Sequence, residues 1–557
     1  MIYSYLFEAK SIQHYLFKTG KVKDIIATSE RLDLLIDDNT ESLLYKVLHQ
    51  ANLTSDLIDN NKDQQSINFI RCKGGAFYCY SKNKEALITL RSLWTISVQQ
   101  MFPSLEFTDA FVEENSLQNA IENGHKQLAA DRNTPVIKLP FATTINERFN
   151  RTGDVAIPIS NTARNDDNQT IDIDTNLHRQ AYRNLSMKDG AALQDKFTPS
   201  SLQSVKGESR KINYPVDLEN NFQFLAENVT TKSQKEAIKD IALIHIDGNG
   251  LGLLLRALQS ALVDATDTQF CQAFRQFSEA LCTATQQAAQ KATQEIYNIA
   301  KYQLSGSEKV YVPMRPLVLG GDDVTLLCRA DLALKYSSIF CEAFKRLSET
   351  ALKTLYNEHL NKVGNIKPYL TASGGILYHK ASHPFVHSYH LVEGLCAKAK
   401  QLTKEIDHNV GPAALAFYRL SGSVSSDIET LCNQSQLFTV KDQNCSEQQL
   451  SLGLNAYVVN ENDHHQSLAN LMRCIELSNA PKTSTSMTKW RQMATALALG
   501  NKIEAERIYD RSVELGDKQL TKLQSQQLSV LAGLSVRDEH FHQWCWKDKN
   551  HKSNDLQ

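Results

Sequence analysis

Two short segments place three carboxylates where apolar strands end, and this feature most constrains the fold. The first segment, IALIHIDGNGLG, carries Asp247 directly after the apolar run 241–246, which is too short and too β-branched to be typical of a helix. The second, PLVLGGDDVTLL, carries Asp322 and Asp323 in a glycine turn between two further apolar runs, the composition of a β-hairpin. We therefore expect three carboxylates on adjacent strands.

Three neighbouring carboxylates indicate a site for two divalent cations. Mg²⁺ prefers oxygen ligands and is usually held by one or two carboxylates together with substrate phosphates. Two such ions about 4 Å apart can activate an attacking hydroxyl and stabilise a leaving pyrophosphate. Asp247, Asp322 and Asp323 are therefore candidate catalytic residues that bind two Mg²⁺ or Mn²⁺ ions, and the predicted chemistry is nucleotidyl transfer. The alternative is an ordinary turn, since Gly and Asp are common turn residues.

The order of the surrounding elements favours the catalytic interpretation. Helices are expected over 251–263 and 269–300, followed by the hairpin, a helix over 332–360, a strand in PYLTASGGILYHK, a helix over 385–406 and a strand over 413–418. This order, β-αα-ββ-α-β-α-β, is typical of the palm of polymerases and nucleotide cyclases, in which the first strand lies beside the central hairpin.

Several motifs together resemble one family. HIDGNGLG, GGDD, LTASGGI and AKAK are similar to the second palm of the large subunit of type III CRISPR effector complexes, and YLFEAKSIQHYLFKTGKVKDIIATSERL resembles the opening segment of that subunit. The resemblance implies a cyclic oligoadenylate synthase that uses ATP as its substrate in antiviral defence. It also implies two nucleotides held between two palms, and partners that include other effector subunits and guide or target RNA.

The expected fold class is α+β, with two ferredoxin-like palms, an insertion between them and a helical C-terminal domain. The predicted boundaries are 1–115 for the first palm, 116–235 for a polar insertion, 236–420 for the catalytic second palm and 421–557 for the helical domain. The first palm is degenerate, because its hairpin FIRCKGGAFYCY has Ala76 and Phe77 where the second palm has Asp322 and Asp323.

Two departures from the family pattern concern metals. Members of the family often carry an N-terminal histidine-aspartate nuclease domain, whereas this sequence starts at the first palm, so we expect no DNase activity. They also often carry a four-cysteine zinc module between the palms, but FNRTGDVAIPI has no cysteines and zinc is not expected. Asp172 and Asp174 form a DxD motif in a polar stretch, where we expect solvated side chains.

Further residues are candidates for binding the nucleotide. Glycines that lead into a helix expose backbone amides that suit a triphosphate, glycines in a strand permit close approach of a base or ribose, and lysines near a helix end can reach a phosphate as point charges. The candidates are Gly248, Asn249, Gly250, Gly320, Gly321, Ser373, Gly374, Lys398 and Lys400. The alternatives are glycines that only relieve crowding and lysines on a solvated helix face.

Composition sets outer limits on function. The 557 residues have a net charge of −2, which argues against a protein whose main task is to coat nucleic acid. The 11 cysteines include no CxxC pair, which is typical of reduced thiols in the cytoplasm. No apolar run approaches the roughly 18 residues of a membrane span, and no signal peptide is evident. A cytoplasmic protein without membrane association is therefore expected.

Three other functions remain possible from the sequence. A diguanylate cyclase shares the palm, but here the turn ends in a second Asp, and Arg315 is followed three residues later by Val318, so the Arg-x-x-Asp inhibitory site is missing. A template-copying polymerase finds little support in the near-neutral charge. A scaffold subunit of an RNA-guided complex could bind nucleotide without turning it over. Nothing in the sequence distinguishes adenine from guanine or one ring size from another.

Overall fold

The structure of the protein is a computed structural model of the whole chain. It describes residues 1–557 except 38–39, 59–65, 135–142, 158–169, 188–191, 203–211, 216–217, 219–239, 304–309, 365, 421–426, 442–446, 452–455, 461–466, 470, 473–488, 490–491, 493–494, 497–498, 515–529, 536–539 and 546–557.

The second palm has the predicted order of elements. These are β7 (Asp240–Asn249), α9 (Leu251–Ala261), α10 (Asp267–Gln303), β8 (Met314–Gly320), β9 (Asp323–Arg329), α11 (Ala330–Glu358), β10 (Thr371–Lys380), α12 (Phe385–Ile406) and β11 (Ala414–Arg419). Strand β7 is central in a six-stranded sheet of order β14-β11-β10-β7-β9-β8. It is antiparallel to both β9 and β10, so the expected pairing of the first strand with the hairpin is confirmed.

Both faces of this sheet are buried, which explains the continuous apolar character of β7. Residues 242, 244 and 246 pack with α10 and α11, whereas residues 241 and 243 pack with α12 and with part of the first palm. Side chains alternate between the two faces of a strand. Position 247 therefore belongs to the face that α12 covers.

The first palm is also a ferredoxin-like unit, as predicted. It contains β1 (Ile2–Lys10), α1 (Ile12–Phe17), α2 (Val22–Asp33), α3 (Leu43–Gln50), β2 (Asn68–Lys73), β3 (Ala76–Ser81), α4 (Lys84–Met101) and β4 (Glu106–Glu114), with the antiparallel strand order β2-β3-β1-β4. The predicted end at residue 115 is too early, because the next helix, α5 (Leu117–Asp131), packs on β1 and β4.

The described part of the insertion contains β5 (Ala156–Ile157), β6 (Ile171–Asp172), α6 (Ile173–Met187), α7 (Ala192–Phe197) and η1 (Ser200–Leu202). The expectation of solvated carboxylates in this segment is wrong: the exposed fractions are 1% for Asp172 and 5% for Asp174. Asp172 accepts hydrogen bonds from the backbone N–H of Thr175, at 2.7 Å, and from the hydroxyl of Thr152. A carboxylate at the start of a helix satisfies N–H groups that have no partner within the helix.

The C-terminal region contains strands as well as the expected helices. Its described elements are α13 (Ile428–Gln436), β12 (Leu437–Lys441), β13 (Glu447–Ser451), β14 (Tyr457–Val458), α16 (Lys502–Glu514), β15 (Val530–Ser535) and β16 (His540–Cys545). Strand β14 pairs with β11, so the sheet of the second palm continues beyond the predicted boundary at residue 420. Periodicity indicated the helices but not these short strand pairs.

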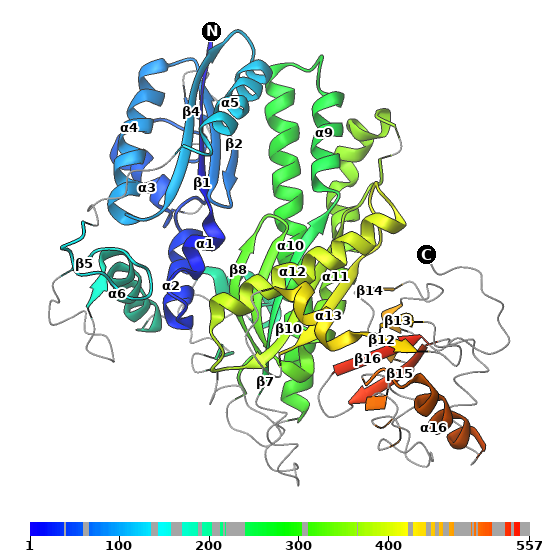
Figure 1. Cartoon of the computed structure of the whole chain (residues 1–557). Coiled ribbons are helices and arrows are strands. Elements are labelled where there is room, and N and C mark those ends of the chain that lie inside the picture. Colours follow the sequence, from blue (N-terminus) through cyan, green and yellow to red (C-terminus); the bar gives the residue numbers. More distant parts are fainter. Residues whose placement is uncertain are drawn as a thin grey trace.

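Helix α10 runs alongside both palms (Figure 1). Near its start, the guanidinium of Arg275 donates to the backbone oxygen of Phe69 at 3.1 Å and pairs with Asp56, both in the first palm. Farther along, the hydroxyl of Thr285 donates to the backbone oxygen of Gly321 at 2.7 Å, in the turn between β8 and β9. One helix therefore connects the first palm to the carboxylate-bearing turn.

Among the described residues, no helix combines the length and the apolar character that crossing a bilayer requires.

Candidate active site

The β8–β9 turn brings its two carboxylates to the end of β7. Ile246 pairs with Val324 in an antiparallel arrangement, so Asp247, which follows Ile246, and Asp323, which precedes Val324, lie at the same end of this pair of strands. Gly321 has a φ of 62°, a left-handed conformation that favours glycine, and its carbonyl is fixed by Thr285. A Cβ atom at Gly320 would meet no other atom within 4 Å. This strand pairing places Asp247 beside the turn that carries Asp322 and Asp323.

Asp322 lies against the backbone of β7. A Cβ atom at Gly248 would come within 2.7 Å of the Oδ2 atom of Asp322, so only glycine permits this approach. Burial, followed by the charge of Asp247, raises the pKa of Asp322 to about 7. Proximity of two carboxylates disfavours ionisation of both. A bound cation would relieve this repulsion, which fits the predicted role of these residues.

Asp323 is held by two side chains. Its Oδ1 atom lies 3.2 Å from Nδ1 of His245, and its Oδ2 atom accepts a hydrogen bond of 3.0 Å from Nε2 of Gln13, in the first palm. Nδ1 of His245 also lies 3.0 Å from the hydroxyl of Thr325. Burial alone would lower the pKa of His245, but the hydrogen bond and charge of Asp323 outweigh it and the net shift is upward.

Asp247 forms an ion pair with Lys400 of α12. The pKa of Lys400 is raised because the carboxylate of Asp247 outweighs the effect of burial. Lys398 lies two residues earlier on the same helix and therefore points elsewhere. Its charge acts on Asp427 and Cys432, at α13. Lys400 thus lies at the carboxylates, while the predicted nucleotide contact of Lys398 is not supported.

Asn249 and Ser373 form hydrogen bonds inside the second palm, and their predicted contacts with a nucleotide stay a prediction. Ser373 is fully buried, and its hydroxyl lies 2.8 Å from Nδ2 of Asn249 and 2.9 Å from the hydroxyl of Thr403. Gly374 is also buried, and a Cβ atom there would come within 2.7 Å of Ile246. These residues are occupied with the interior of the palm, so close packing, and not ligand approach, explains the glycine.

Gly250 has a local structural role. Its φ of 87° ends β7 and begins α9, and a Cβ atom would come within 2.8 Å of Val410. The backbone amides at the start of α9 remain a feature suited to phosphate.

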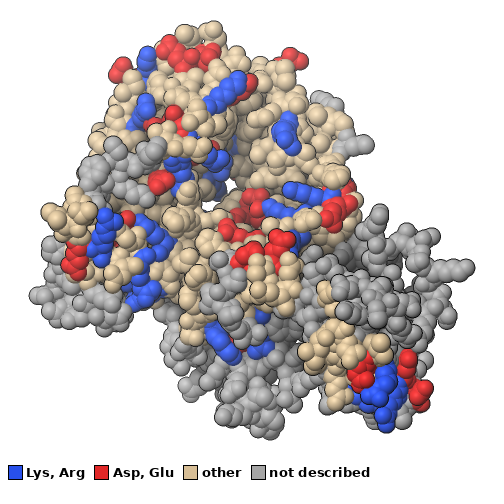
Figure 2. Space-filling model, in the orientation of Figure 1, with Lys and Arg blue, Asp and Glu red and all other residues tan. Residues whose placement is uncertain are grey.

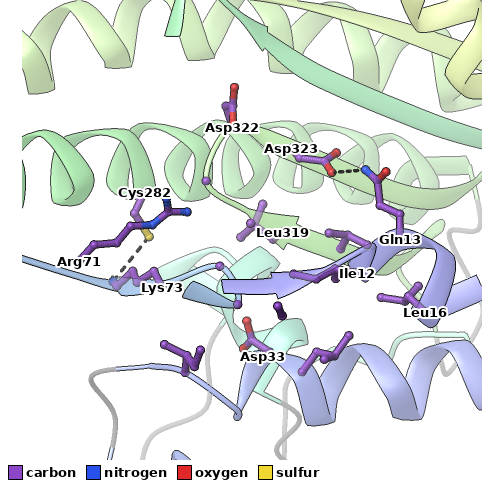
Figure 3. Close-up of a pocket in the computed structure, with 18 of the residues that line it drawn as sticks. Ile12, Gln13, Leu16, Asp33, Arg71, Lys73, Cys282, Leu319, Asp322 and Asp323 are labelled. Atoms are coloured by element: carbon purple, nitrogen blue, oxygen red, sulfur yellow. Dashed lines mark hydrogen bonds between the residues drawn. The ribbon is translucent and has the colours of Figure 1, made fainter. Parts of the chain in front are cut away.

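A cavity of about 1240 Å³ lies between the two palms. Figure 3 shows Asp322 and Asp323 above it, with Gln13, Arg71 and Lys73 of the first palm around it. On the face seen in Figure 2, acidic and basic side chains are mixed around the hollow between the palms. The cavity therefore offers the turn carboxylates of the second palm, while the first palm lines it with both cationic and acidic groups, including Arg71 and Asp33.

Four residues of the site were missed by the sequence analysis. Gln13 is 310 positions away in the chain, and no local pattern connects it to the turn. Tyr389 and Glu393 of α12 line the cavity. His245 could have been found, because it precedes Asp247 by two residues and alternation places both on one face of β7.

The donor set fits a divalent cation, although the side chains are not gathered around one point. Among the described residues, no group of three or more His, Cys, Asp or Glu side chains is arranged to hold a metal. However, Oδ1 of Asp323 is buried with only the contact of His245, and the ammonium group of Lys400 pairs with Asp247 at a position that a metal cation could take. Oxygen ligands of this kind are those that Mg²⁺ and Mn²⁺ prefer.

Comparison with known families agrees with this geometry. Residues 240–406 match the family model described as Cas10/Cmr2, second palm domain. This part of the chain is similar to the second palm domain of Cas10/Cmr2. The match runs from β7 to α12 and includes Asp247, the GGDD turn and Lys400. Among curated proteins there is no match to the chain.

Solved structures similar to the chain include three that contain Csm1. The Csm1–Csm4 subcomplex of the type III-A CRISPR-Csm interference complex is 11% identical, with 95% of this chain and 65% of that chain covered and a TM-score of 0.48. A Csm1–Csm4 cassette in complex with cA4 is 12% identical, with 85% and 58% covered and a TM-score of 0.44. Csm1 of T. onnurineus is 12% identical, with 90% and 64% covered and a TM-score of 0.40. The chain thus spans less than two thirds of the length of each.

Proposed function

We propose that this chain is a nucleotidyltransferase that joins ATP into a cyclic oligonucleotide. The observation that carries the proposal is that Asp322 and Asp323 line a cavity shared by two palms, with Asp247 at the end of the neighbouring strand. A volume of about 1240 Å³ exceeds the usual range for one small ligand, about 300–1,000 Å³, and supports the presence of two nucleotides.

In this proposal the three carboxylates hold two Mg²⁺ or Mn²⁺ ions. When bound, such ions supply positive charge that favours ionisation of a ribose hydroxyl and departure of pyrophosphate. With a pKa of about 7, the carboxyl of Asp322 is partly protonated near neutral pH, and it loses this proton when it becomes a cation ligand. Lys400, which pairs with Asp247, is placed to transfer its charge to a phosphate of the incoming nucleotide.

The proposed reaction is a displacement at the α-phosphorus, in which one P–O bond forms and another breaks. The ribose hydroxyl oxygen of one nucleotide attacks the α-phosphorus of the other, and a new P–O bond forms. The bond from the α-phosphorus to the bridging oxygen breaks, pyrophosphate leaves and the hydroxyl proton passes to solvent. Repetition of this step lengthens the oligonucleotide, and attack by the terminal hydroxyl of the oligonucleotide on its own α-phosphorus closes the ring.

We further propose that the chain works with other type III CRISPR effector subunits and with guide or target RNA. The family of its second palm supports this proposal. The near-neutral net charge of −2 also suggests that partner subunits supply much of any RNA-binding surface.

A gated or non-catalytic scaffold is a second candidate, and one observation favours it. Asp247 is paired with Lys400, and Asp323 is held by His245 and Gln13, so the carboxylates face protein partners instead of a common point. A subunit in this arrangement would need a partner or a substrate to release the carboxylates before turnover.

Product analysis distinguishes these candidates. The purified chain is incubated with each labelled NTP and Mg²⁺ or Mn²⁺, with and without its partner subunits and target RNA, and products are resolved by mass. A cyclic product from ATP that is lost in Asp322→Ala/Asp323→Ala supports the synthase. A product from GTP alone would indicate a guanylate cyclase, and no product under any condition would favour the scaffold.

A further inference from the structure

Helix α1 of the first palm has a contact with each of three parts of the molecule. Its residue Gln13 reaches Asp323 in the second palm, Tyr15 reaches the insertion, and Phe17 reaches α12. Figure 3 shows Gln13 pointing from this helix to Asp323. A helix of six residues is too short to hold its own position, so these contacts determine where Gln13 lies.

The insertion fixes α1 through a buried polar cluster. The hydroxyl of Tyr15 donates to Oδ1 of Asp174 at 2.9 Å and lies 3.2 Å from Nε2 of His178. Nη1 of Arg31 lies 2.7 Å from Nδ1 of His178. Because arginine can only donate, Nδ1 must accept and His178 is neutral. The cluster is almost fully enclosed, so Tyr15 has little freedom to move.

The second palm fixes the other end of α1. The ring of Phe17 packs on Tyr389 with a centroid distance of 3.9 Å, and Tyr389 meets the ring of His245 edge-on at 5.8 Å. His245 in turn contacts Oδ1 of Asp323, while Gln13 contacts Oδ2. Both oxygens of Asp323 are therefore oriented by a set of packed side chains that passes through α1.

We propose that Gln13 is a positioning residue for the nucleotidyl-transfer site, supplied by the palm that has lost its own hairpin carboxylates. The inference rests on the proposed function of Asp323 as a cation ligand. The amide of Gln13 orients the carboxylate without adding charge, so Asp323 keeps its negative charge for the cation. The insertion contributes indirectly, because it fixes the helix that carries Gln13.

The test measures binding of a fluorescent ATP analogue to the full chain as a function of Mn²⁺ concentration. Gln13→Leu removes the amide at nearly constant volume, and we expect the apparent affinity to fall about tenfold, as for loss of a hydrogen bond to a charged group. The matched control is Gln100→Leu, since Gln100 lies exposed on α4 of the first palm, outside the cavity, and its side chain has no hydrogen bond to the described residues. The control should leave the affinity within twofold of wild type.

A double-mutant cycle separates positioning from a general structural role. In an Asp323→Asn background, a further Gln13→Leu change should alter the affinity by less than twofold, because the two residues act through one contact. An equal loss in both backgrounds would overturn the proposal, as would a Gln13→Leu variant that binds like Gln100→Leu. Unfolding midpoints of all variants show whether a loss of binding reflects a loss of fold.

The binding readout also keeps this inference distinct from the proposed synthesis. If wild type binds the analogue with Mn²⁺ but makes no product, the proposed synthesis fails while the cycle still decides the role of Gln13. If wild type shows no binding that depends on Mn²⁺, both proposals are wrong.

Discussion

Gly248 lies in close contact with Asp322. A Cβ atom at position 248 would come within 2.8 Å of the Cβ atom of Asp322 and 2.7 Å of its Oδ2 atom. Real Cβ atoms do not approach other heavy atoms this closely. The position of the candidate ligand therefore depends on the absence of a side chain in a neighbouring strand.

Gly248→Ala should displace Asp322 and lower kcat about a hundredfold, since misplacement of a catalytic group by about 1 Å has effects of this size. The control is Gly252→Ala, where a Cβ atom meets nothing within 4 Å. That change lies in a helix and should stabilise it by up to about 1 kcal/mol. Steady-state rates and thermal unfolding of both variants test the prediction, and similar rates for the two would contradict it.

Lys400→Met should raise the apparent KM for ATP about tenfold, because in the proposed mechanism the ammonium group that pairs with Asp247 transfers its charge to a phosphate. Lys398→Met removes the same charge from the same helix on a side that faces α13. It should change the KM by less than twofold. Equal effects of the two substitutions would mean that the charge acts at long range and that the ion pair has no specific role.

Cation affinity should rise with pH between about 6 and 8. Burial and the neighbouring charge of Asp247 raise the pKa of Asp322 to about 7 from an ordinary value of 3.8. Below the raised value the carboxyl must lose a proton to bind a cation, so affinity falls as pH is lowered. Titration of Mn²⁺ at several pH values measures the slope, which Asp322→Asn should flatten. A wild-type affinity independent of pH in this range would contradict the assignment.

The same group should make the protein without added cations less stable as pH rises. Between about 4 and 7 the folded Asp322 holds a proton that the unfolded chain has lost, so the stabilisation present at low pH disappears as pH rises through the folded pKa. Asp322→Asn should therefore raise the unfolding midpoint more at pH 8 than at pH 4.5, in the presence of EDTA. An equal shift at both pH values would count against a raised pKa.

Tyr15→Phe should destabilise the chain by roughly 1–3 kcal/mol, because buried Asp174 would lose a hydrogen-bond donor. Urea unfolding measures the change. Tyr45→Phe is the control, since the hydroxyl of Tyr45 has no hydrogen bond to any described residue and its removal should have little effect. If the two variants unfold alike, the buried cluster is not an anchor for α1.

The sequence allowed prediction of those parts of the site that depend on local chemistry. Asp247 follows an apolar strand, and glycines mark the turn at Asp322 and Asp323, so strand pairing brings the three together. Lys398 and Lys400 were both candidates because lysines near a helix end can reach a phosphate. Two positions apart, they lie on different sides of the helix, but the sequence does not show which of the two sides meets the carboxylates.

Other features depend on contacts that no local pattern contains. Gln13 reaches Asp323 across 310 positions, so its role emerges only when both palms are folded together. Asp172 and Asp174 look solvated because their neighbours are polar, yet helix capping and Tyr15 bury them. Ser373 and Gly374 seemed open to a ligand, whereas close packing of β10 against β7 and α12 explains them.

The most direct test of a two-cation nucleotidyl-transfer site is to count the Mn²⁺ ions bound per chain by electron paramagnetic resonance in the presence of a non-hydrolysable ATP analogue. The account predicts two ions in wild type and a loss of at least about a hundredfold in affinity when both hairpin carboxylates are replaced in Asp322→Asn/Asp323→Asn. Mn²⁺ binding that is unchanged in this double variant would contradict it.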